Sequence, residues 1–286
     1  MPTDPWPATV ARVRRLEEMG YDHLWVYDHL SWQRYQDRAW MGTYTWLAGL
    51  AAVTSRIGLG TMVANPNIRH PLTLAKDAIT IDQISDGRMI LGIGAGGTGF
   101  DARILGQWPL SAKERTDRLI EHVHLLDGLL RGTMQDHTGE HYEVEGARTL
   151  PGCVQQPRLP IVIAAGGSRG LRLAADVADG WITFGDTTGT DLTPSGTERV
   201  VREQAELLDF HCATFGRDPA TMRRYYLIGN TAERPLASID AFEDFIGRYR
   251  ALGFTDIVFH HPRPDDPVWN EPVGIVEQIA ERLLRS

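Results

Sequence analysis

An aspartate and a histidine stand side by side at the end of an apolar stretch near the start of the chain. Residues 22–29 read DHLWVYDH, and Asp28 and His29 close the stretch. Histidine titrates near neutral pH, and a neighbouring carboxylate can accept a proton or orient a ligand. The pair could therefore perform acid-base chemistry. The alternative is that Asp28 caps the next segment and that His29 is a partly buried packing residue.

A second apolar stretch passes directly into a polar segment that contains prolines. GLGTMVA at 58–64 is followed by NPNIRHP at 65–71. Gly58 and Gly60 would let another backbone or a flat ligand approach the strand closely. The alternative is that the prolines only set the next helix, since Pro71 is typical of a first helical position. The two explanations concern different residues, so both can hold.

Glycine-rich stretches follow two further apolar runs. The first is LGIGAGGTGFD at 91–101, which contains Gly94, Ala95 and Gly96. We interpret its glycines as making room for a ligand, because a dinucleotide fingerprint normally lies in the first βα unit.

The second glycine-rich stretch is IAAGGS at 163–168, which ends an apolar run and opens an amphipathic one. Free backbone N–H groups and the helix dipole at such a junction could hold a phosphate group. The candidate cofactor-binding residues here are Ala165, Gly166, Gly167 and Ser168. The alternative is simple capping of the helix by Ser168.

Aromatic and histidine side chains near strand ends could line a substrate pocket. Trp32 and Trp40 follow the Asp-His pair and could form an apolar wall. His260 and His261 follow the run TDIVF, and adjacent strand residues face opposite sides, so at most one enters the site. We assign His261 to the substrate pocket. No His-x-His or His-Glu-x-x-His pattern occurs, so we expect no metal.

Alternation of short apolar runs with amphipathic stretches explains how these residues could meet. We expect eight main helices and seven strands, with a helix first and a hairpin within 137–152. The runs MILGI and IVIAA are apolar at consecutive positions, which is typical of a parallel sheet covered on both faces. The pattern predicts an α/β TIM (β/α)8-type barrel, whose first strand is missing from this chain, in one domain over residues 1–286. Loops after the carboxyl ends of the strands would form its active face.

Composition excludes several classes of function. The 286 residues carry a formal net charge of −8 and no Lys/Arg-rich block, which argues against a nucleic-acid partner. The two cysteines are far apart and outside any CxxC pattern, as is typical of a reducing compartment. No apolar run approaches the ~18 to 20 residues that span a bilayer. We expect a cytoplasmic protein with no membrane partner.

The motifs together resemble the bacterial luciferase-like superfamily of flavin- or deazaflavin-dependent oxidoreductases. The resemblance covers most of residues 8–185 and is carried by GYDHLWVYDH, by SRIGLGTMVANPNIRHPLTLAKDAITIDQISDGRMILGIGAG, by GEHYEVEGARTLPGCVQQPRLPIVIAAGG and by AADVADGW. The C-terminal third matches mainly in its order of elements. The resemblance implies a TIM barrel with a tricyclic ring at its carboxyl-terminal face.

The resemblance also implies roles for individual residues. Asp28 and His29 match a pair that contacts the ring and the substrate. Met62 and Val63 match a non-prolyl cis peptide in a bulge behind the ring, and Asn65 matches a position that hydrogen-bonds the ring edge. Residues 166–168 match the phosphate site.

The same resemblance suggests a cofactor and a reaction. Asp-His at the first strand end is similar to enzymes that use the deazaflavin coenzyme F420, whereas Glu-His-His is typical of FMN enzymes. We therefore expect F420, with FMN as the alternative. The expected reaction is hydride transfer to or from a small organic substrate, with His29 as acid or base. Gly97 stands where some deazaflavin sugar dehydrogenases carry a catalytic glutamate, which argues against a sugar substrate.

Two other functions stay open at this point. One is an FMN-dependent two-component monooxygenase, and the other is a catalytically silent paralogue that binds a ligand. The expected partners are a small-molecule substrate, a second copy of the chain in a homodimer, and a separate flavin or F420 reductase.

Overall fold

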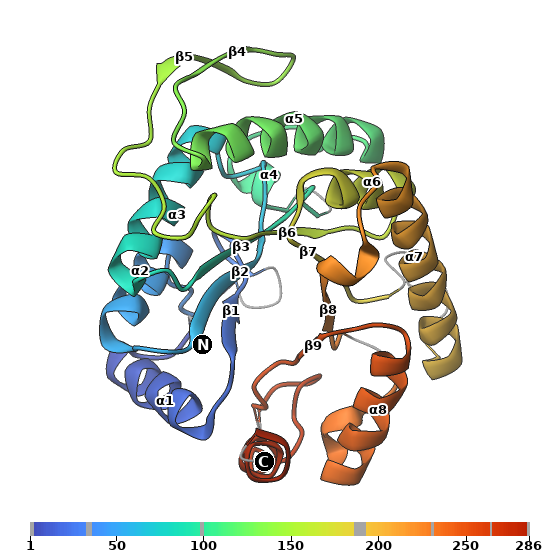
Figure 1. Cartoon of the computed structure of the whole chain (residues 1–286). Helices are drawn as coiled ribbons and strands as arrows, with labels where there is room; N and C mark the ends of the chain where they lie inside the picture. Colours follow the sequence, from blue (N-terminus) through green and yellow to red (C-terminus); the bar gives the residue numbers. More distant parts are fainter. Residues whose placement is uncertain are drawn as a thin grey trace. The chain divides into compact units, whose positions relative to one another are not determined.

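The computed structural model describes residues 3–32, 36–97, 100–185, 193–229, 232–263 and 265–284. The chain divides into two compact units, Met1–Ala164 and Ala165–Ser286, each built of strands and helices (Figure 1). The elements of the first unit are α1 (Trp6–Met19), β1 (His23–Val26), α2 (Thr43–Val53), β2 (Gly58–Ala64), α3 (Pro71–Ser85), β3 (Met89–Gly94), α4 (Phe100–Ile104), α5 (Ala112–Leu130), β4 (Gln135–Thr138), β5 (Glu143–Ala147) and β6 (Ile161–Ala164).

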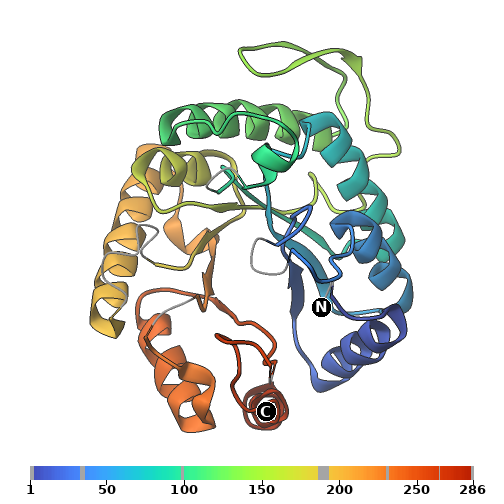
Figure 2. The same cartoon turned by 180° about the vertical axis from the view of Figure 1, so that it is seen from behind.

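Parallel strands form the centre of the first unit. They lie in the order β1-β2-β3-β6, and every neighbouring pair is parallel. All six residues of β3 are buried, as the run of consecutive apolar residues predicts. Helix α2 packs against α3, and α3 packs against α5, so the helices form a layer on one side of the strands (Figure 2).

Local sequence signals explain where the helices of the first unit begin and end. Helix α1 ends at Gly20, which adopts a left-handed conformation with φ of 94°. Pro71 is the first residue of α3, as expected. Helix α5 begins with a capping box, in which Ser111 and Glu114 bond each other's backbone N–H groups. The hairpin expected after α5 is formed by the antiparallel strands β4 and β5.

The second unit has the same alternation of strand and helix. Its elements are α6 (Ser168–Val177), β7 (Gly180–Thr183), α7 (Pro194–Thr214), β8 (Arg223–Leu227), α8 (Ile239–Ala251), β9 (Asp256–Val258) and α9 (Ile275–Ile279), with 3-10 turns η2 (Pro219–Thr221) and η3 (Pro235–Ala237) and a π-helical turn η4 (Ala280–Leu284). Strands β7, β8 and β9 are parallel in that order. The ring of Tyr226 in β8 packs at a tilt against that of Tyr249 in α8, with centroids 4.1 Å apart, so aromatic packing holds helix to strand.

The predicted elements agree with the structure in type and order. The eight expected helices correspond to α1, α2, α3, α5, α6, α7, α8 and α9, and the seven expected strands to β1, β2, β3, β6, β7, β8 and β9. Helix α4 was not predicted, because five residues are too short to show helical periodicity. The expectation of a single domain stays a prediction.

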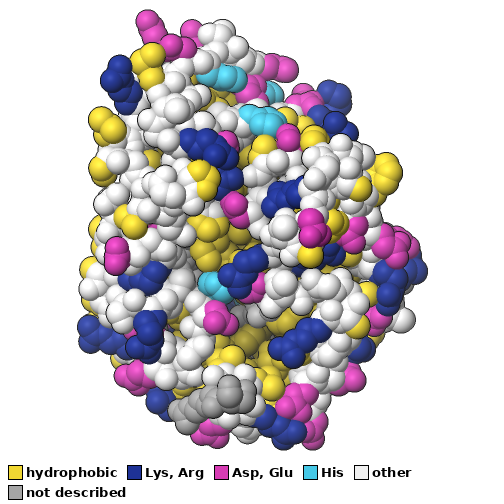
Figure 3. All heavy atoms as spheres, in the orientation of Figure 1, with side chains coloured by type: hydrophobic (Ala, Val, Ile, Leu, Met, Phe, Trp, Pro, Cys, Tyr) yellow, Lys and Arg dark blue, Asp and Glu magenta, His cyan; other side chains and the backbone are white. Residues whose placement is uncertain are grey.

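On the face drawn in Figure 3, basic and acidic side chains are interspersed. Within the described ranges, no helix is long and apolar enough to cross a membrane.

Candidate functional site

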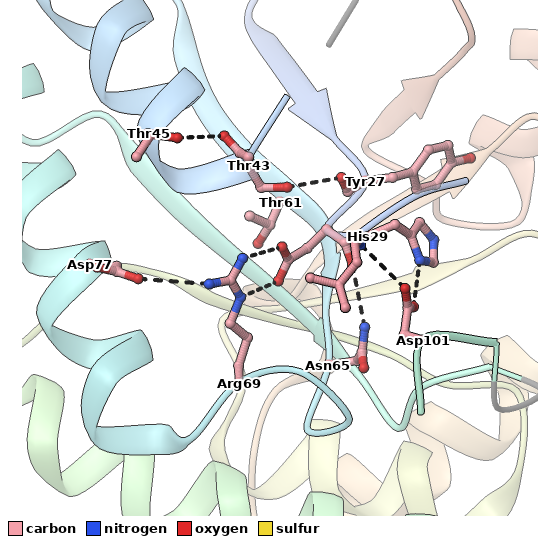
Figure 4. A network of polar contacts seen from close by, with 12 residues as sticks. Tyr27, His29, Thr43, Thr45, Thr61, Asn65, Arg69, Asp77 and Asp101 are labelled. Atoms are coloured by element: carbon pink, nitrogen blue, oxygen red, sulfur yellow. Dashed lines mark hydrogen bonds and ion pairs between the residues drawn. The ribbon is translucent and has the colours of Figure 1, made fainter. Parts of the chain in front are cut away.

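The histidine of the first strand end forms a close pair with an aspartate distant in sequence. Nδ1 of His29 lies 2.7 Å from Oδ2 of Asp101, which is on the short helix α4 (Figure 4). The other carboxylate oxygen of Asp101 accepts a bond from the backbone N–H of Leu30. An ionised carboxylate can only accept, so Nδ1 of His29 carries a proton, and in the neutral imidazole Nε2 then has the lone pair. The His29 side chain is 26% exposed, which leaves the imidazole accessible.

The neighbouring aspartate is engaged in a different way. The side chain of Asp28 is completely buried, and its two oxygens accept bonds from Arg69 at 2.7 and 2.9 Å (Figure 4). Such a bidentate pair fixes both groups. Both oxygens of the Asp28 carboxylate are thus bonded to Arg69. A direct contact of Asp28 with a ligand would involve other atoms of this residue, and it stays a prediction. The structure separates the two residues that the sequence analysis treats as one pair.

The electrostatics around Arg69 follow from this burial. Burial alone would lower the pKa of Arg69, but its hydrogen bond to Asp28 and the charge of Asp28 outweigh that effect and raise it. Tyr44 lies with its ring 4.6 Å below the guanidinium, and burial together with the charge of Asp28 raises the pKa of Tyr44 well above its ordinary value. Burial also raises the pKa of Asp77. Arg69 therefore remains the permanent counter-charge of Asp28.

The strand β2 has the irregularity that the resemblance predicts. The peptide bond between Met62 and Val63 is cis, and the pairing of β2 with β3 changes register between Thr61 and Ala64. Gly94 of β3 makes room for this irregularity, because a Cβ at that position would lie 2.9 Å from a methyl group of Val63. The need for glycine at 94 thus has a structural cause besides any ligand.

Gly58 and Gly60 serve a different purpose from the one expected. A Cβ on Gly60 would lie 2.4 Å from the ring of Trp25, and one on Gly58 would lie 2.7 Å from the ring of His23. Both rings belong to β1, the neighbouring strand. The expectation that these glycines admit a backbone or a flat ligand was wrong, because aromatic side chains fill the space.

The loop after β2 is held by its own asparagines. Oδ1 of Asn65 accepts from the backbone N–H of Asn67, and Nδ2 of Asn65 lies 3.4 Å from the backbone oxygen of Asp28. Asn67 accepts a bond from Arg118 of α5 and packs against Gly96, whose φ is 85°. Asn65 is 3% exposed, so its contact with a ring edge, like the roles of Ala95 and Gly96, stays a prediction.

Aromatic rings surround the imidazole of His29. The ring of Trp32 lies 4.9 Å from that of His29, and the ring of Trp40 lies 6.3 Å from it. The two indoles are nearly parallel, with centroids 6.2 Å apart. The structure thus brings together His29 and the two tryptophans of the predicted substrate pocket.

The predicted phosphate site lies in the second unit, at the start of α6. Gly167 is the N-cap of α6, and Ser168 is its first residue. The N-cap residue is thus a glycine, which has no side chain to cap the helix, so capping by Ser168 was wrong. A Cβ on Gly167 would meet nothing within 4 Å, which leaves open space beside the backbone. The hydroxyl of Ser168 lies 3.1 Å from Nε2 of His211 on α7.

An uncapped helix end with open space beside it fits an anionic group. On this observation, the residues present are compatible with a phosphate of a cofactor. His261 does not contribute to this helix end in the described contacts, and its Nδ1 lies 3.0 Å from the backbone oxygen of Pro262. Its assignment to a substrate pocket stays a prediction.

Sequence reasoning missed the two partners of the Asp-His pair. Asp101 ends the glycine-rich stretch 91–101, and Arg69 lies in the polar segment after β2. We identified both stretches as candidate site segments from their glycines, prolines and asparagine, and not from their charged residues. The charged residue in each stretch was the signal that could have indicated a partner, because a buried carboxylate or an imidazole at a strand end needs one.

Comparison with known proteins gives a consistent result. The family model described as luciferase-like monooxygenase matches residues 1–250. A protein of Nakamurella multipartita named F420-dependent glucose-6-phosphate dehydrogenase is 32% identical, over 93% of this chain and 89% of its own length. A protein of the same name from Microbacterium testaceum is 29% identical, over 94% of this chain and 91% of its own length.

Two solved structures share the fold over nearly the whole chain. The coenzyme F420 dependent tetrahydromethanopterin reductase from Methanopyrus kandleri has a TM-score of 0.74 at 17% identity, covering 98% of this chain and 95% of its own. An F420-dependent secondary alcohol dehydrogenase has a TM-score of 0.77 at 16% identity, covering 98% of this chain and 94% of its own. These likenesses confirm the predicted α/β fold of the TIM-barrel type.

Proposed function

Because the chain belongs to the luciferase-like monooxygenase family, we propose that it is an F420-dependent oxidoreductase that transfers a hydride to or from a small organic substrate. The enzyme class and the family agree with the sequence analysis. The choice of F420 is supported by the names of two relatives that are each similar over more than nine-tenths of this chain.

The observation that carries the proposal is the pair of His29 and Asp101. An imidazole with Nδ1 bonded to a carboxylate and with a free Nε2 can take up or release one proton at a defined atom. The coenzyme, when bound, supplies the hydride chemistry. His29 then takes the proton from a substrate hydroxyl during oxidation, or returns it during reduction.

The other residues of the first unit serve this proton transfer. Trp32 and Trp40 provide apolar surface beside the imidazole, which would exclude water and favour an apolar or aromatic part of the substrate. Arg69 neutralises the buried carboxylate of Asp28, so the residue before His29 is held in one position. His29 is the catalytic residue of the proposal, and Asp101 is a positioning residue.

Two separate groups of residues, each described within its own unit, are compatible with a part of the coenzyme. In the first unit, Met62, Val63 and Gly94 form the irregular part of the β2-β3 pair that the resemblance assigns to the ring. In the second unit, Gly167 and Ser168 open the uncapped helix α6, whose first-turn N–H groups suit a phosphate.

The substrate of the relatives does not transfer simply to this chain. Their names specify glucose 6-phosphate. In this chain Gly97 stands where we expect the catalytic glutamate of deazaflavin sugar dehydrogenases, and the aromatic surroundings of His29 favour a less polar molecule. We therefore propose a small alcohol or carbonyl compound with an apolar part.

The test is a pair of assays with the purified protein. Oxidised F420 with a panel of secondary alcohols, and reduced F420 with the matching ketones, should change the visible absorbance of the coenzyme without oxygen. Glucose 6-phosphate is included in the panel as the relatives' substrate. Oxygen consumption with FMN and a flavin reductase, and none of the F420 reactions, would favour the two-component monooxygenase and contradict the proposal.

A further inference from the structure

The second unit contains a pocket that none of the residues considered so far explains. Its volume is about 210 Å³, and it lies beyond the carboxyl ends of β8 and β9. Ile228 and Gly229 follow β8, His260 comes shortly after β9, and the remaining wall comes from residues 232–236, 267–269 and 271. Ligand pockets for drug-sized molecules usually measure about 300 to 1,000 Å³. This pocket therefore suits a smaller molecule.

One carboxylate oxygen in the wall lacks a hydrogen-bond partner among the residues that the structure describes. The side chain of Glu271 is 8% exposed. Its Oε1 lies 3.3 Å from Nη2 of Arg234, whereas its Oε2 is buried and accepts no hydrogen bond within the described part of the chain. Buried acceptors are nearly always satisfied in native proteins, because an unpaired one loses its hydration without compensation. The unpaired oxygen therefore points to a missing donor.

The other charged groups of the wall do not supply that donor. Arg234 also donates to Oδ1 of Asn270 at 2.6 Å, so its guanidinium is already shared. Glu233 is bonded to Arg248, which does not line the pocket. Arg248 balances the charge of Glu233, and Arg234 contacts only one oxygen of Glu271, so the acceptor left over is the charged Oε2 of Glu271, which suits a cation that carries an N–H group.

The histidine of the wall is neutral and adds no positive charge. Its ring stacks on that of Trp269 with centroids 3.8 Å apart. Burial, with a smaller effect of Arg263, lowers the pKa of His260 to about 3. Leu236 and Ile228 contribute apolar surface to the same pocket.

We propose that this pocket binds a small organic ammonium ion, with an N–H group that donates to Oε2 of Glu271 and a short alkyl part against Leu236 and Ile228. The proposal uses residues of the second unit alone and does not depend on F420 or on the reaction of His29. It can therefore stand or fall separately from the proposed function.

The test measures binding by NMR on the full chain without cofactor. Ethylammonium chloride is titrated into 15N-labelled protein, and the indole N–H signal of Trp269, assigned with Trp269→Phe, is followed. The signal should shift to saturation. Sodium chloride at equal ionic strength and tetramethylammonium, a cation without N–H groups, should not produce the saturable shift.

Three variants decide the role of Glu271. Glu271→Gln should weaken ethylammonium binding by about tenfold or more, because the charged acceptor is lost. Arg234→Gln should tighten it, because the competing guanidinium is removed. Glu206→Gln on the exposed side of α7 is the matched control and should bind like the unmodified protein.

Two results would overturn the proposal. One is the absence of a saturable shift with ethylammonium in the unmodified protein and in Arg234→Gln. The other is a shift of the same size with tetramethylammonium or in a folded Glu271→Gln. If Glu271→Gln does not fold, the opposite change expected for Arg234→Gln still decides the matter.

Discussion

His29 and Asp101 show how single residues at the end of a strand can be placed for chemistry. The 2.7 Å contact orients the imidazole and specifies which nitrogen carries the proton. Trp32 and Trp40 then restrict the approach of a substrate to that imidazole from the side on which their indole rings lie. Proton transfer at one defined atom is what the proposed oxidoreductase needs from its own side chains.

Removal of the Asp101 carboxylate should disturb His29 in a measurable way. In the unmodified protein, 15N NMR of the neutral His29 imidazole should show the proton on Nδ1. In Asp101→Ala this preference should be lost, and kcat of the proposed reaction should fall by about 10- to 100-fold, less than in His29→Ala. KM should change little, because Asp101 acts through His29.

Asp240→Asn provides the control for this experiment. Asp240 lies on α8 with a side chain that is 85% exposed, so both the NMR signal and kcat should stay unchanged. An Asp101→Ala protein with the same His29 tautomer and the same kcat would contradict the positioning role.

The ion pair of Asp28 and Arg69 contributes to the stability of the fold rather than to proton transfer. Arg69→Met leaves the fully buried Asp28 carboxylate without its counter-charge and should lower the free energy of unfolding by about 2 to 3 kcal/mol. Urea denaturation measures this loss. The double variant Asp28→Asn with Arg69→Met should recover part of it, because no buried charge remains.

An exposed ion pair offers the comparison. Lys113, whose side chain is 80% exposed, pairs with Asp117 on α5. Lys113→Met should change the free energy of unfolding by less than about 0.5 kcal/mol. Equal losses in Lys113→Met and Arg69→Met would show that burial of Asp28 has no special cost.

Residue types at the strand ends predicted part of the site, but the partners of these residues could not be predicted. Asp28 and His29 stood out because charged and titratable residues ended an apolar strand. Asp101 is 72 positions from His29, and Arg69 is 41 from Asp28. One sequence contains no signal that links such distant positions. The cis bond at Met62 was expected from family resemblance and not from the local residues.

At the scale of elements, the hairpin β4-β5 is joined to α5 by one carboxylate. Glu121 of α5 accepts bonds from Nε2 of His137 and from the backbone N–H groups of His141 and Tyr142. Burial by itself would raise the pKa of Glu121, but these hydrogen bonds outweigh it and lower the pKa below its ordinary value. The ionised form is therefore favoured in the folded protein.

This lowered pKa predicts a loss of stability in acid. A carboxyl group with a lower pKa in the folded state stabilises the fold above its unfolded pKa. The stabilisation disappears as the pH falls through the folded pKa. Hydrogen exchange of the hairpin amides, after correction for the intrinsic exchange rate, should therefore accelerate as the pH falls from the unfolded pKa of Glu121 through its folded pKa.

Glu121→Gln tests the source of the effect. The variant cannot ionise at this position, so its hairpin should lack that part of the pH dependence and should already be weaker at neutral pH. Glu143→Gln, on an exposed position of β5, is the matched control. An unchanged pH profile in Glu121→Gln would mean that another group causes the acid sensitivity.

Elements were predicted well because their signals are local. Periodic apolar positions, Gly20 at the end of α1 and Pro71 at the start of α3 each act within a few residues. Helix α4 gave no such signal, and it carries Asp101. Asp101 was therefore missed together with the helix that carries it.

At the scale of the whole molecule, alternation of strands and helices was sufficient to predict the fold class. Consecutive apolar residues in β3 and β6 indicated parallel strands, and both are paired in parallel in the structure. The identity of the cofactor is a finer question, because barrels of one family can hold different ring systems. We propose that it depends on a few residues, including Asp28, His29 and the start of α6.

The most direct measurement is a titration of the purified protein with F420 and, separately, with FMN, followed by coenzyme fluorescence. The account predicts saturable binding of F420 at least about tenfold tighter than binding of FMN. Ser168→Asp, which places a negative charge at the start of α6, should weaken F420 binding by a similar factor, whereas Ser195→Asp, in the first turn of α7, should not. Tighter binding of FMN, or no binding of F420, would contradict the central claim.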